Sequence, residues 1–293
     1  MKVPPELALT LAAAVDAGSL EAASHALHLT QSAVSQRIAT LERMTGQVLL
    51  VRSRPVRATE SGEAVVRYAR QLAHLDEDLA HGLGLDATAT PLRLAVNADS
   101  LSTWLLAPLA EVCATHDIAV ELSREDEART ADLLASGAVL AAIATSARPV
   151  PGCTVTSLGS MAYRASAAPA YVDRWLPDGS HEGALAKAPV VDFDSHDDLQ
   201  TRWLREVAPR ATPPRHRVPS STEFATAIRL GMGWGMLSAT VPTGDTLVDL
   251  GGPTIDVPLY WQQWRLGSTA LDTVAQALIR AARSALATPH ASS

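Results

Sequence analysis

The sequence predicts an α+β multidomain protein with a winged helix-turn-helix domain (residues 1–58), a linker helix (59–90) and a C-terminal α/β domain (91–293). Three observations lead to this fold class. Helical patterns and a basic turn fill the first segment, an apolar stripe of near-heptad spacing runs through the second, and short apolar runs alternate with helical patterns in the third. With 293 residues, 47% of them hydrophobic, the chain can form two or three buried cores.

Residues 7–45 are predicted to form three short helices. Gly18 ends the first, Ser19 can cap the second and Thr30 can cap the third, because a hydroxyl oxygen at these positions accepts a free N–H group of the first turn. The third helix carries an apolar stripe at spacings of four and three residues, which consists of Val34, Ile38 and Leu41. This stripe is expected to face inward, and Gly46 is expected to end the helix.

The opposite face of the third helix is polar and consists of Thr30, Gln31, Ser32, Ser35, Gln36 and Arg37. In the major groove of double-stranded DNA, glutamine can bond adenine and arginine can bond guanine. Two short strands, 48–51 and 56–58, would form a wing whose basic side chains contact phosphates; these are Arg52, Arg54 and Arg57. An ordinary helical hairpin with a solvated polar face is the alternative.

The distribution of charge supports a DNA-binding surface at this end of the chain. The net charge is −7, yet residues 30–70 contain seven arginines against three glutamates, which leaves −11 for the rest. A surface that attracts DNA must therefore be local. The acidic remainder suits a domain with a different task.

A long helix is predicted to begin after Thr59, which can cap it, with Glu60 in its first turn. Its apolar residues recur at spacings of four, three, seven and four; they are Val65, Ala69, Leu72, Leu79 and Leu83. A solvated single helix does not need such a stripe. We therefore predict a dimerisation helix, in a homodimer or a dimer of dimers, that ends near residues 82–86.

The C-terminal domain is expected to contain a largely parallel sheet. The predicted strands are 92–96, 118–122, 139–144, 155–158, 161–167, 190–193 and 259–264, with helices after Ser100 and over residues 130–135. Gly231, Gly233 and Gly235 follow a helical pattern, so they indicate a helix-to-strand turn and not a dinucleotide loop. Trp261 and Trp264 are expected to pack in the core or at a hinge.

Two groups of polar residues follow predicted strands and mark a candidate ligand site. Ser100 and Ser102 would open a helix, whose N–H groups can hold a carboxylate, although simple capping is the commoner role for serine. Glu125, Asp126 and Glu127 follow the second strand at the edge where open α/β sheets bind ligands. They can pair with a cationic ligand. From the residues alone, a solvated acidic loop is the more favoured reading.

Several classes of site and of location are not indicated. Cys113 and Cys153 lack the spacing of a disulfide framework or a zinc site, the histidines show no metal spacing, and no set of nucleophile, base and orienting acid is evident. We therefore expect no enzyme activity, no metal and no cofactor. No apolar stretch is long enough to span a membrane, and Pro4, Pro5 and Glu6 disrupt a signal-peptide pattern. A cytoplasmic protein is expected; a solute-binding protein of a transport system is the alternative.

The stretch over residues 18–63 resembles the N-terminal signature of the LysR-type transcriptional regulators; it reads GSLEAASHALHLTQSAVSQRIATLERMTGQVLLVRSRPVRATESGE. Within that family the resemblance is to the LysG/ArgP subgroup, regulators of basic amino-acid export, on the segments NADSLSTWLL, REDEART, APVVDFDSHDDLQ, GMGWGM and PLYWQQWRL. Two positions depart from the family pattern. Ser32 stands where many members have proline, and Ala141 lies where the wider family usually has an aspartate.

The resemblance implies a periplasmic-binding-protein-like effector domain of two subdomains, I (about 91–162 and 266–293) and II (about 163–265). It implies a small-molecule effector in the cleft between them, L-lysine or L-arginine and less readily histidine, and an exporter gene as the target. The acidic triplet is then favoured as a ligand site, and four more residues would line the same cleft: Thr145, Asp194, Thr222 and Glu223. RNA polymerase is a further partner that the family role would allow.

Overall fold

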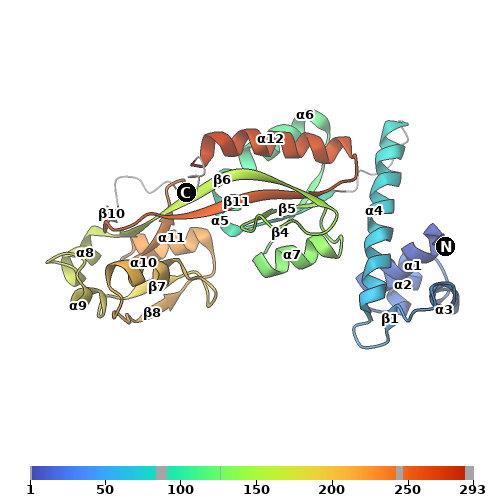
Figure 1. Cartoon of the computed structure of the whole chain (residues 1–293), viewed down its shortest axis with the longest axis horizontal. Helices are drawn as coiled ribbons and strands as arrows, with labels where there is room; N and C mark the ends of the chain where they lie inside the picture. Colours follow the sequence, from blue (N-terminus) through green and yellow to red (C-terminus); the bar gives the residue numbers. More distant parts are fainter. Residues whose placement is uncertain (1, 84–90, 126, 242–246, 288–293) are drawn as a thin grey trace.

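The computed structural model describes residues 2–83, 91–125, 127–241 and 247–287. It has three parts, which Figure 1 shows in order along the chain: a small N-terminal domain, the long helix α4, and an elongated C-terminal domain. The N-terminal domain and α4 lie at one end of the molecule, and the C-terminal domain extends away from α4.

The N-terminal domain contains three helices and a two-stranded wing. Its elements are α1 (Pro5–Asp16), α2 (Leu20–Ala26), α3 (Gln31–Thr45), β1 (Leu50–Val51) and β2 (Arg57–Ala58). The expected caps are confirmed: Ser19 Oγ accepts from the Ala22 N–H at 3.1 Å and Thr30 Oγ1 accepts from the Ala33 N–H at 3.2 Å. Gly46 ends α3 with φ +66°, in the left-handed region that glycine adopts without strain.

The apolar stripe of α3 faces inward as expected. Its three members pack with α1, with the strand residues and with the first half of α4; they are Val34, Ile38 and Leu41. Gly62 in α4 makes this packing possible, because a Cβ there would lie 1.9 Å from the backbone oxygen of Leu49. The stripe thereby fixes α3 with its polar face outward.

Helix α4 spans Glu60–Gly82, and Thr59 caps it through a hydrogen bond of 3.0 Å from the Gly62 N–H. Its first half packs against α1. Its second half and the residue that follows it expose large apolar side chains at spacings of four residues: Leu75 is 41%, Leu79 is 61% and Leu83 is 64% exposed. Of the predicted stripe, Ala69 is buried, Val65 and Leu72 are partly buried, and Leu79 and Leu83 are exposed.

The C-terminal domain contains a mixed sheet, so the prediction of a largely parallel sheet is wrong. Its strand order is β10-β6-β11-β5-β3-β4, and β9 also pairs with β6. Only β3 pairs in parallel, with β4 and β5, whereas β6 and β11 form antiparallel pairs. These strands are β3 (Leu92–Val96), β4 (Val120–Arg124), β5 (Ala141–Ala144), β6 (Cys153–Ala167), β9 (Gly235–Ser238), β10 (Val248–Asp249) and β11 (Ile255–Trp264).

Two long strands join the two lobes of this domain. β6 is one continuous strand where the sequence predicts two, 155–158 and 161–167, and it pairs with β11 along its length. In Figure 1 both strands run from one lobe into the other. The half of β11 beyond Leu259 pairs with β5, so the chain returns to the first lobe within β11 and not at the expected residue 265.

Helices cover the sheet and form the second lobe. The first lobe contains α5 (Ala98–Ser102), α6 (Leu106–His116), α7 (Glu127–Ala135) and α12 (Thr269–Ala285). The second lobe contains α8 (Pro169–Trp175), α9 (Glu182–Leu185), α10 (Leu199–Val207), α11 (Ser221–Arg229) and the parallel pair β7 (Val190–Asp192) and β8 (Arg215–Arg217). Gly231 and Gly233 lie in the turn from α11 to β9 and Gly235 begins β9, which confirms the predicted helix-to-strand turn.

Aromatic side chains fill the interior of both lobes. Trp261 is 1% and Trp264 is 6% exposed, which confirms the expectation that they pack inside. In the second lobe, the rings of Trp203 and Trp234 lie 4.9 Å apart between centroids. Within the described residues, no helix combines the length and the apolar character needed to cross a membrane.

Candidate functional site

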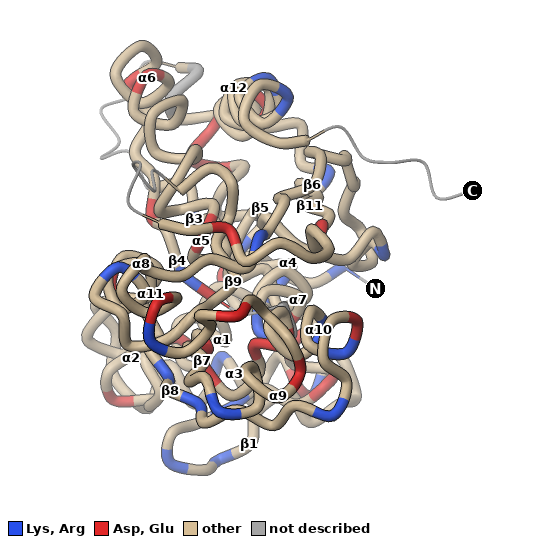
Figure 2. The backbone as a smooth tube through the Cα atoms, turned by 90° about the vertical axis from the view of Figure 1, so that its left-hand side faces the viewer, with Lys and Arg blue, Asp and Glu red and all other residues tan. Residues whose placement is uncertain are grey.

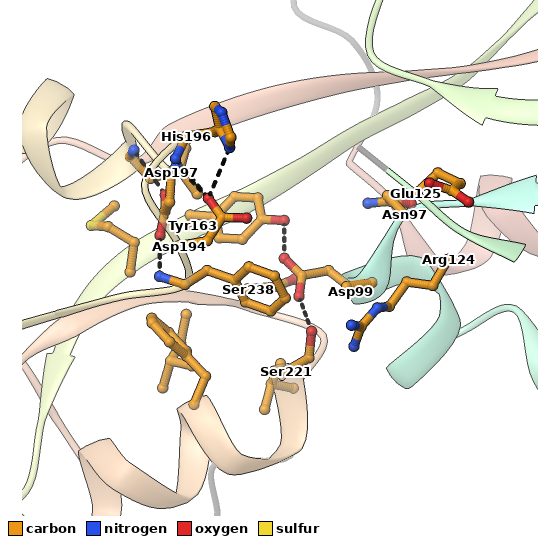
Figure 3. Close-up of a pocket in the computed structure, with 17 residues that line it drawn as sticks. Asn97, Asp99, Arg124, Glu125, Tyr163, Asp194, His196, Asp197, Ser221 and Ser238 are labelled. Carbon is orange, nitrogen blue, oxygen red and sulfur yellow. Dashed lines mark hydrogen bonds and ion pairs between the residues drawn. The ribbon is translucent and has the colours of Figure 1, made fainter. Parts of the chain in front are cut away.

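A cavity of about 450 Å³ lies between the two lobes of the C-terminal domain. Residues at the ends of β3 and β4 form one side, the turn after β7 and the start of α11 form the other, and Tyr163 of β6 lies between them (Figure 3). The polar residues that line it are Asn97, Asp99, Arg124, Glu125, Tyr163, Asp194, His196, Asp197, Ser221 and Ser238. The ends of neighbouring parallel strands thus meet at the cleft, as in other open α/β sheets.

Asp99 links the two sides of the cavity. Its Oδ2 accepts a hydrogen bond of 2.5 Å from Tyr163 Oη, and its Oδ1 accepts one of 2.8 Å from Ser221 Oγ (Figure 3). Burial, together with the negative charge of Asp99, raises the pKa of Tyr163 well above its ordinary value of 10.0. Tyr163 therefore stays protonated, and its O–H orients the Asp99 carboxylate.

Two further carboxylates come from the turn after β7. Asp197 accepts backbone N–H bonds from Phe193 at 2.8 Å and Leu199 at 3.2 Å, while Asp194 Oδ1 accepts from the His196 N–H at 2.7 Å. Burial raises the pKa of Asp197 above its ordinary 3.8, although the hydrogen bonds oppose this shift. Asp197 is thus a desolvated carboxylate that a cationic group would favour in its ionised form.

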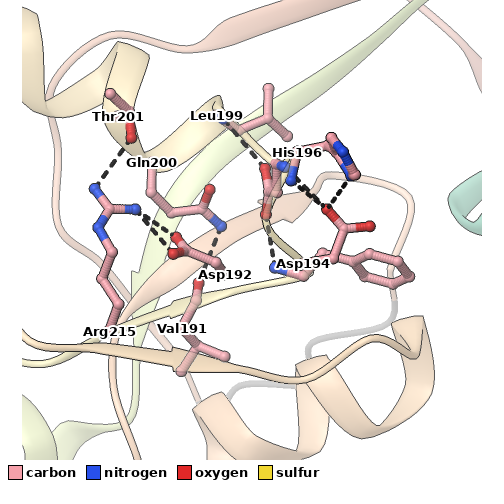
Figure 4. Close-up of polar contacts among 10 residues, drawn as sticks. Val191, Asp192, Asp194, His196, Leu199, Gln200, Thr201 and Arg215 are labelled. Carbon is pink, nitrogen blue, oxygen red and sulfur yellow. Dashed lines mark hydrogen bonds and ion pairs between the residues drawn. The ribbon is translucent and has the colours of Figure 1, made fainter. Parts of the chain in front are cut away.

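An ion pair between the buried Asp192 and the partly exposed Arg215 holds β7 and the turn that follows it. Arg215 Nη1 donates to both carboxylate oxygens of Asp192 at 2.8 and 2.9 Å, and Arg215 Nη2 donates to Thr201 Oγ1 at 3.0 Å (Figure 4). Gln200 Nε2 donates to the Val191 carbonyl oxygen at 3.0 Å. These contacts hold β7 against β8 and α10. The turn after β7, which carries Asp194 and Asp197, is thereby held in place.

Apolar side chains complete the wall of the cavity. The rings of Phe193 and Phe224 lie 6.5 Å apart between centroids, and Leu199, Met236 and Val241 continue the surface. The cavity therefore combines four carboxylates and one arginine with an apolar wall. This composition suits a small molecule with an aliphatic stem and more positive than negative groups.

The predicted effector residues are distributed over several places. Glu125 and Asp194 line the cavity, while Ser102 and Thr222 line a neighbouring cavity of about 170 Å³. Ser100 lies inside α5 and not at its start, buried, with no hydrogen-bond partner for its Oγ among the described residues. Glu223 is exposed and accepts a hydrogen bond from Ser220 Oγ.

Of the remaining three predicted residues, the structure describes the side chain of Thr145 alone. Thr145 follows the end of β5, outside the residues that line the cavity. Asp126 lies outside the described residues, and Glu127 begins α7, with its side chain also outside the description.

Sequence reasoning missed eight of the ten polar residues that line the cavity: Asn97, Asp99, Arg124, Tyr163, His196, Asp197, Ser221 and Ser238. Asp99 and Asp197 had a usable signal, since each lies a few residues after a predicted strand. Tyr163 lies within a strand, and nothing in its local pattern separates it from an ordinary core residue. Ser221 lies beside the predicted Thr222, so only its position at the start of α11 distinguishes it.

The DNA-binding residues are mostly exposed. Gln31, Ser32 and Gln36 are exposed on α3, Ser35 is partly buried, and Thr30 contacts Ser32 through hydroxyl oxygens 3.0 Å apart. The wing arginines 52, 54 and 57 are exposed, and Figure 2 shows basic residues at the wing beside β1.

Three of the arginines within residues 30–70 contact other parts of the protein. Arg37 Nη1 donates to Thr10 Oγ1 of α1 at 3.3 Å, so in this structure its side chain is engaged within the domain. Arg67 and Arg70 contact the C-terminal domain. The basic surface available to DNA is therefore narrower than the charge count over residues 30–70 indicates.

Comparison with known families decides between the possible classes. The family model described as bacterial regulatory helix-turn-helix protein, LysR family, matches residues 6–63, and that of the LysR substrate binding domain matches residues 86–287. The chain belongs to the LysR family. This LysR-family regulator thus has the expected winged helix-turn-helix and ligand-binding domains, and the match over 6–63 disfavours the solute-binding alternative.

Its relatives are LysG and ArgP regulators. The HTH-type transcriptional regulator LysG of Mycobacterium tuberculosis is 41% identical over 289 residues, which cover 96% of this chain and 94% of that protein. The lysine export transcriptional regulatory protein LysG of Corynebacterium glutamicum is 40% identical, with 93% and 96% covered. These relatives are transcription regulators and not enzymes, in agreement with the prediction from sequence.

Solved structures show the same architecture. ArgP from Mycobacterium tuberculosis superposes with a TM-score of 0.90 at 39% identity and covers 99% of this chain and 100% of that chain. Full-length LysG from Corynebacterium glutamicum with bound effector Arg superposes with a TM-score of 0.82 at 40% identity, with 97% and 99% covered. Within the described part of this regulator, no group of three or more potential metal ligands is present.

Proposed function

We propose that this LysR-family regulator binds a basic amino acid, L-arginine or L-lysine, in the interlobe cavity and adjusts the transcription of an amino-acid exporter gene in response. The observation that carries this proposal is the charge of the cavity. Its described lining contains four carboxylates, those of Asp99, Glu125, Asp194 and Asp197, and one guanidinium, that of Arg124. A molecule with two positive groups and one negative group complements this arrangement.

Each part of such a ligand has a chemically matched partner. Arg124 can hold the α-carboxylate through paired N–H groups, and the carboxylates can hold the α-ammonium and the side-chain cation. The methylene stem fits against the wall formed by Phe193 and Phe224. The effector Arg bound to LysG of Corynebacterium glutamicum supports a ligand of this class. Thr145, Ser100 and Glu223 would then influence the ligand from outside the cavity lining.

The same proposal assigns the DNA contacts and the assembly. Gln31, Ser32 and Gln36 on α3 would read bases in the major groove, and the exposed wing arginines would contact phosphates. Because Leu75, Leu79 and Leu83 are uncovered on α4, a second copy of the chain would pair there in a homodimer, the unit of a dimer of dimers. Paired readers imply two half-sites on the DNA.

Calorimetric titration of the full-length protein tests the ligand class. L-arginine, L-lysine and L-citrulline are compared, because citrulline matches arginine in shape but has an uncharged side chain. We expect citrulline to bind about tenfold or more weaker, a difference of about 1.4 kcal/mol. Equal affinities for citrulline and arginine would show that the carboxylates do not select the ligand.

A matched pair of variants tests the site. Glu125 follows the end of β4 and lines the cavity, whereas Glu121 within β4 is exposed and pairs with Arg93 at 3.3 Å. Glu125→Gln is expected to weaken arginine binding, and Glu121→Gln is expected to leave it unchanged. If arginine binding is weakened equally in both variants, the cause is the net charge of the domain and not a contact in the cavity. No change in either would remove Glu125 from the site.

A further inference from the structure

Two arginines of α4 donate hydrogen bonds to the end of α7 in the other domain. Arg67 Nη1 lies 3.0 Å from the Ala135 carbonyl oxygen, and Arg70 Nη1 lies 2.8 Å from that of Ser136. The last carbonyl groups of a helix lack partners within the helix and carry a partial negative charge. Cationic donors are therefore well matched to this end of α7.

Arg70 also reaches the DNA-binding domain. Its Nη2 forms an ion pair with Asp16, the last residue of α1, while its Nη1 remains on Ser136. The side chain of Arg70 is 17% exposed. One guanidinium thus connects the N-terminal domain, the linker helix and the C-terminal domain, and little solvent screens it.

Arg67 is held by packing as well as by its hydrogen bond. Its guanidinium carbon lies 5.8 Å from the ring centroid of Trp264, and Trp264 Nε1 donates to the Leu134 carbonyl oxygen at 3.1 Å. Gly137 adopts φ +68°, and a Cβ there would lie 3.3 Å from Arg67 Cγ. A side chain at residue 137 would thus press on the arginine stem, and the left-handed φ there also favours glycine.

A third side chain on the same face of α4 continues this contact. His74 is 8% exposed, and its Nε2 lies 3.1 Å from Oγ of Ser268, the residue that caps α12. Arg67, Arg70 and His74 are spaced by three and four residues, so they share one helix face. Their contacts define a single interface between α4 and the C-terminal domain.

The other end of α7 borders the ligand cavity. Arg124 and Glu125 line the cavity, and α7 begins at Glu127. In Figure 1 the opposite end of α7 lies next to α4. α7 contains nine residues, so its two ends are joined by a short, regularly hydrogen-bonded element. α7 is thus the described helix that lies between Arg124 and Glu125 of the cavity and the carbonyls that Arg67 and Arg70 contact.

We propose that Arg67 and Arg70 form a latch that fixes the DNA-binding domain against the C-terminal domain, and that α7 connects this latch to the ligand cavity. The link to a basic amino acid rests on the function proposed above. A ligand changes the latch only as far as it binds the latched and unlatched arrangements differently. The latch itself is a property of the ligand-free protein.

Hydrogen exchange of the full-length, ligand-free protein tests the latch directly. The double variant Arg67→Met, Arg70→Met keeps apolar stems but loses both sets of N–H donors. We expect residues 133–140 to lose protection from exchange in this variant. The control is Arg164→Met, since Arg164 is 61% exposed and pairs with Asp249 on the second lobe. Unchanged protection of 133–140 in the double variant would overturn the proposal.

Gly137→Ala disturbs the same contact from the opposite side without altering α4. Because a Cβ at residue 137 presses on Arg67, we expect residues 64–78 of α4 to lose protection in this variant. Thermal melting checks that each variant is folded. Wild-type protection of α4 in a folded Gly137→Ala protein would contradict a latch at this turn.

Measurements of DNA affinity test whether ligand binding in the cavity changes DNA binding through the latch. For the wild-type protein, the ratio of DNA affinities without and with saturating L-arginine is expected to be in the range of about 5- to 150-fold. In the double variant, which still binds arginine, we expect this ratio to fall to about one. A wild-type ratio in that variant would overturn the coupling through the latch. If wild-type protein binds neither arginine nor lysine, the proposed effector is wrong. The existence of the latch is then tested by hydrogen exchange alone.

Discussion

The carboxylate of Asp99 joins three elements that are distant in the sequence. Asp99 lies in α5, and it accepts hydrogen bonds from Tyr163 of β6 and Ser221 of α11. Both donors satisfy oxygens that would otherwise face a partly desolvated cavity. Asp197 differs, because backbone N–H groups hold it while burial opposes its charge. The cavity thus contains one carboxylate that is already paired across the cleft and one that gains from a cationic ligand.

The raised pKa of Asp197 predicts that the affinity for a cationic ligand depends on pH. Its pKa is raised above 3.8, so the folded, ligand-free protein retains this proton to higher pH than the unfolded chain. The contribution of Asp197 to folding stability therefore decreases as pH rises through this range. A bound cation favours the ionised carboxylate. We expect arginine affinity to increase as pH rises through the pKa of Asp197, with release of a proton on binding.

Calorimetry in two buffers of different ionisation enthalpy measures that proton. The apparent enthalpy should differ between the buffers in the acidic range and converge at higher pH, where Asp197 is already ionised. Asp197→Asn should bind arginine more weakly and show a smaller release. Identical proton release by the wild-type protein and this variant would assign the effect to another group.

Gln31 provides the residue-scale test of DNA reading. It is exposed at the start of α3, while the nearby Arg37 is engaged with Thr10. We expect Gln31→Ala to weaken binding to specific DNA by about 1–3 kcal/mol and to leave nonspecific binding unchanged. Gln276→Ala, at an exposed position of α12, is the matched control. An equal loss on specific and random DNA would argue against base contact by Gln31.

At the scale of elements, α4 has two halves with different roles. The first half buries Val66 and Ala69 against the N-terminal domain, and the second half leaves Leu75, Leu79 and Leu83 exposed. One face of α4 carries Arg67 and Arg70, which contact the C-terminal domain. A single helix therefore touches both domains of its own chain and still presents an apolar surface for another chain.

The exposed stripe predicts how the assembly responds to a buried charge. Leu79→Glu would place a carboxylate in the proposed interface between two copies, where its desolvation is unfavourable. We expect this variant to dissociate at concentrations at which the wild-type protein is dimeric, as measured by analytical ultracentrifugation. Ala64→Glu, at an exposed position of the first half of α4, is the control. A Leu79→Glu protein that sediments like the wild type would remove the stripe from the interface.

At the scale of the whole molecule, the basic surface and the acidic cavity lie in different domains. The wing arginines give the DNA-binding domain a basic end, while the interlobe cavity is acidic. The two sites lie in different domains, and α7 and α4 are the described elements that we propose connect them. This arrangement allows a small ligand to act on DNA binding without touching DNA.

The sequence by itself determined the local structure of this protein. Helix caps such as Ser19 and Thr30, the inward stripe of α3 and the wing follow from interactions within a few residues, so pattern and spacing predict them. Glu125 and Asp194 were also found, because residues just beyond predicted strands meet at the edge of a sheet.

Only the tertiary structure decided the pairing of distant segments. The antiparallel pairing of β6 with β11 brings Tyr163 to the cavity, and no local pattern encodes which strand lies beside another. The sequence likewise placed Arg67 and Arg70 in a basic segment but could not show that a second domain docks against them. Strand partners and domain contacts depend on packing between residues far apart in the chain, which periodicity within one segment does not contain.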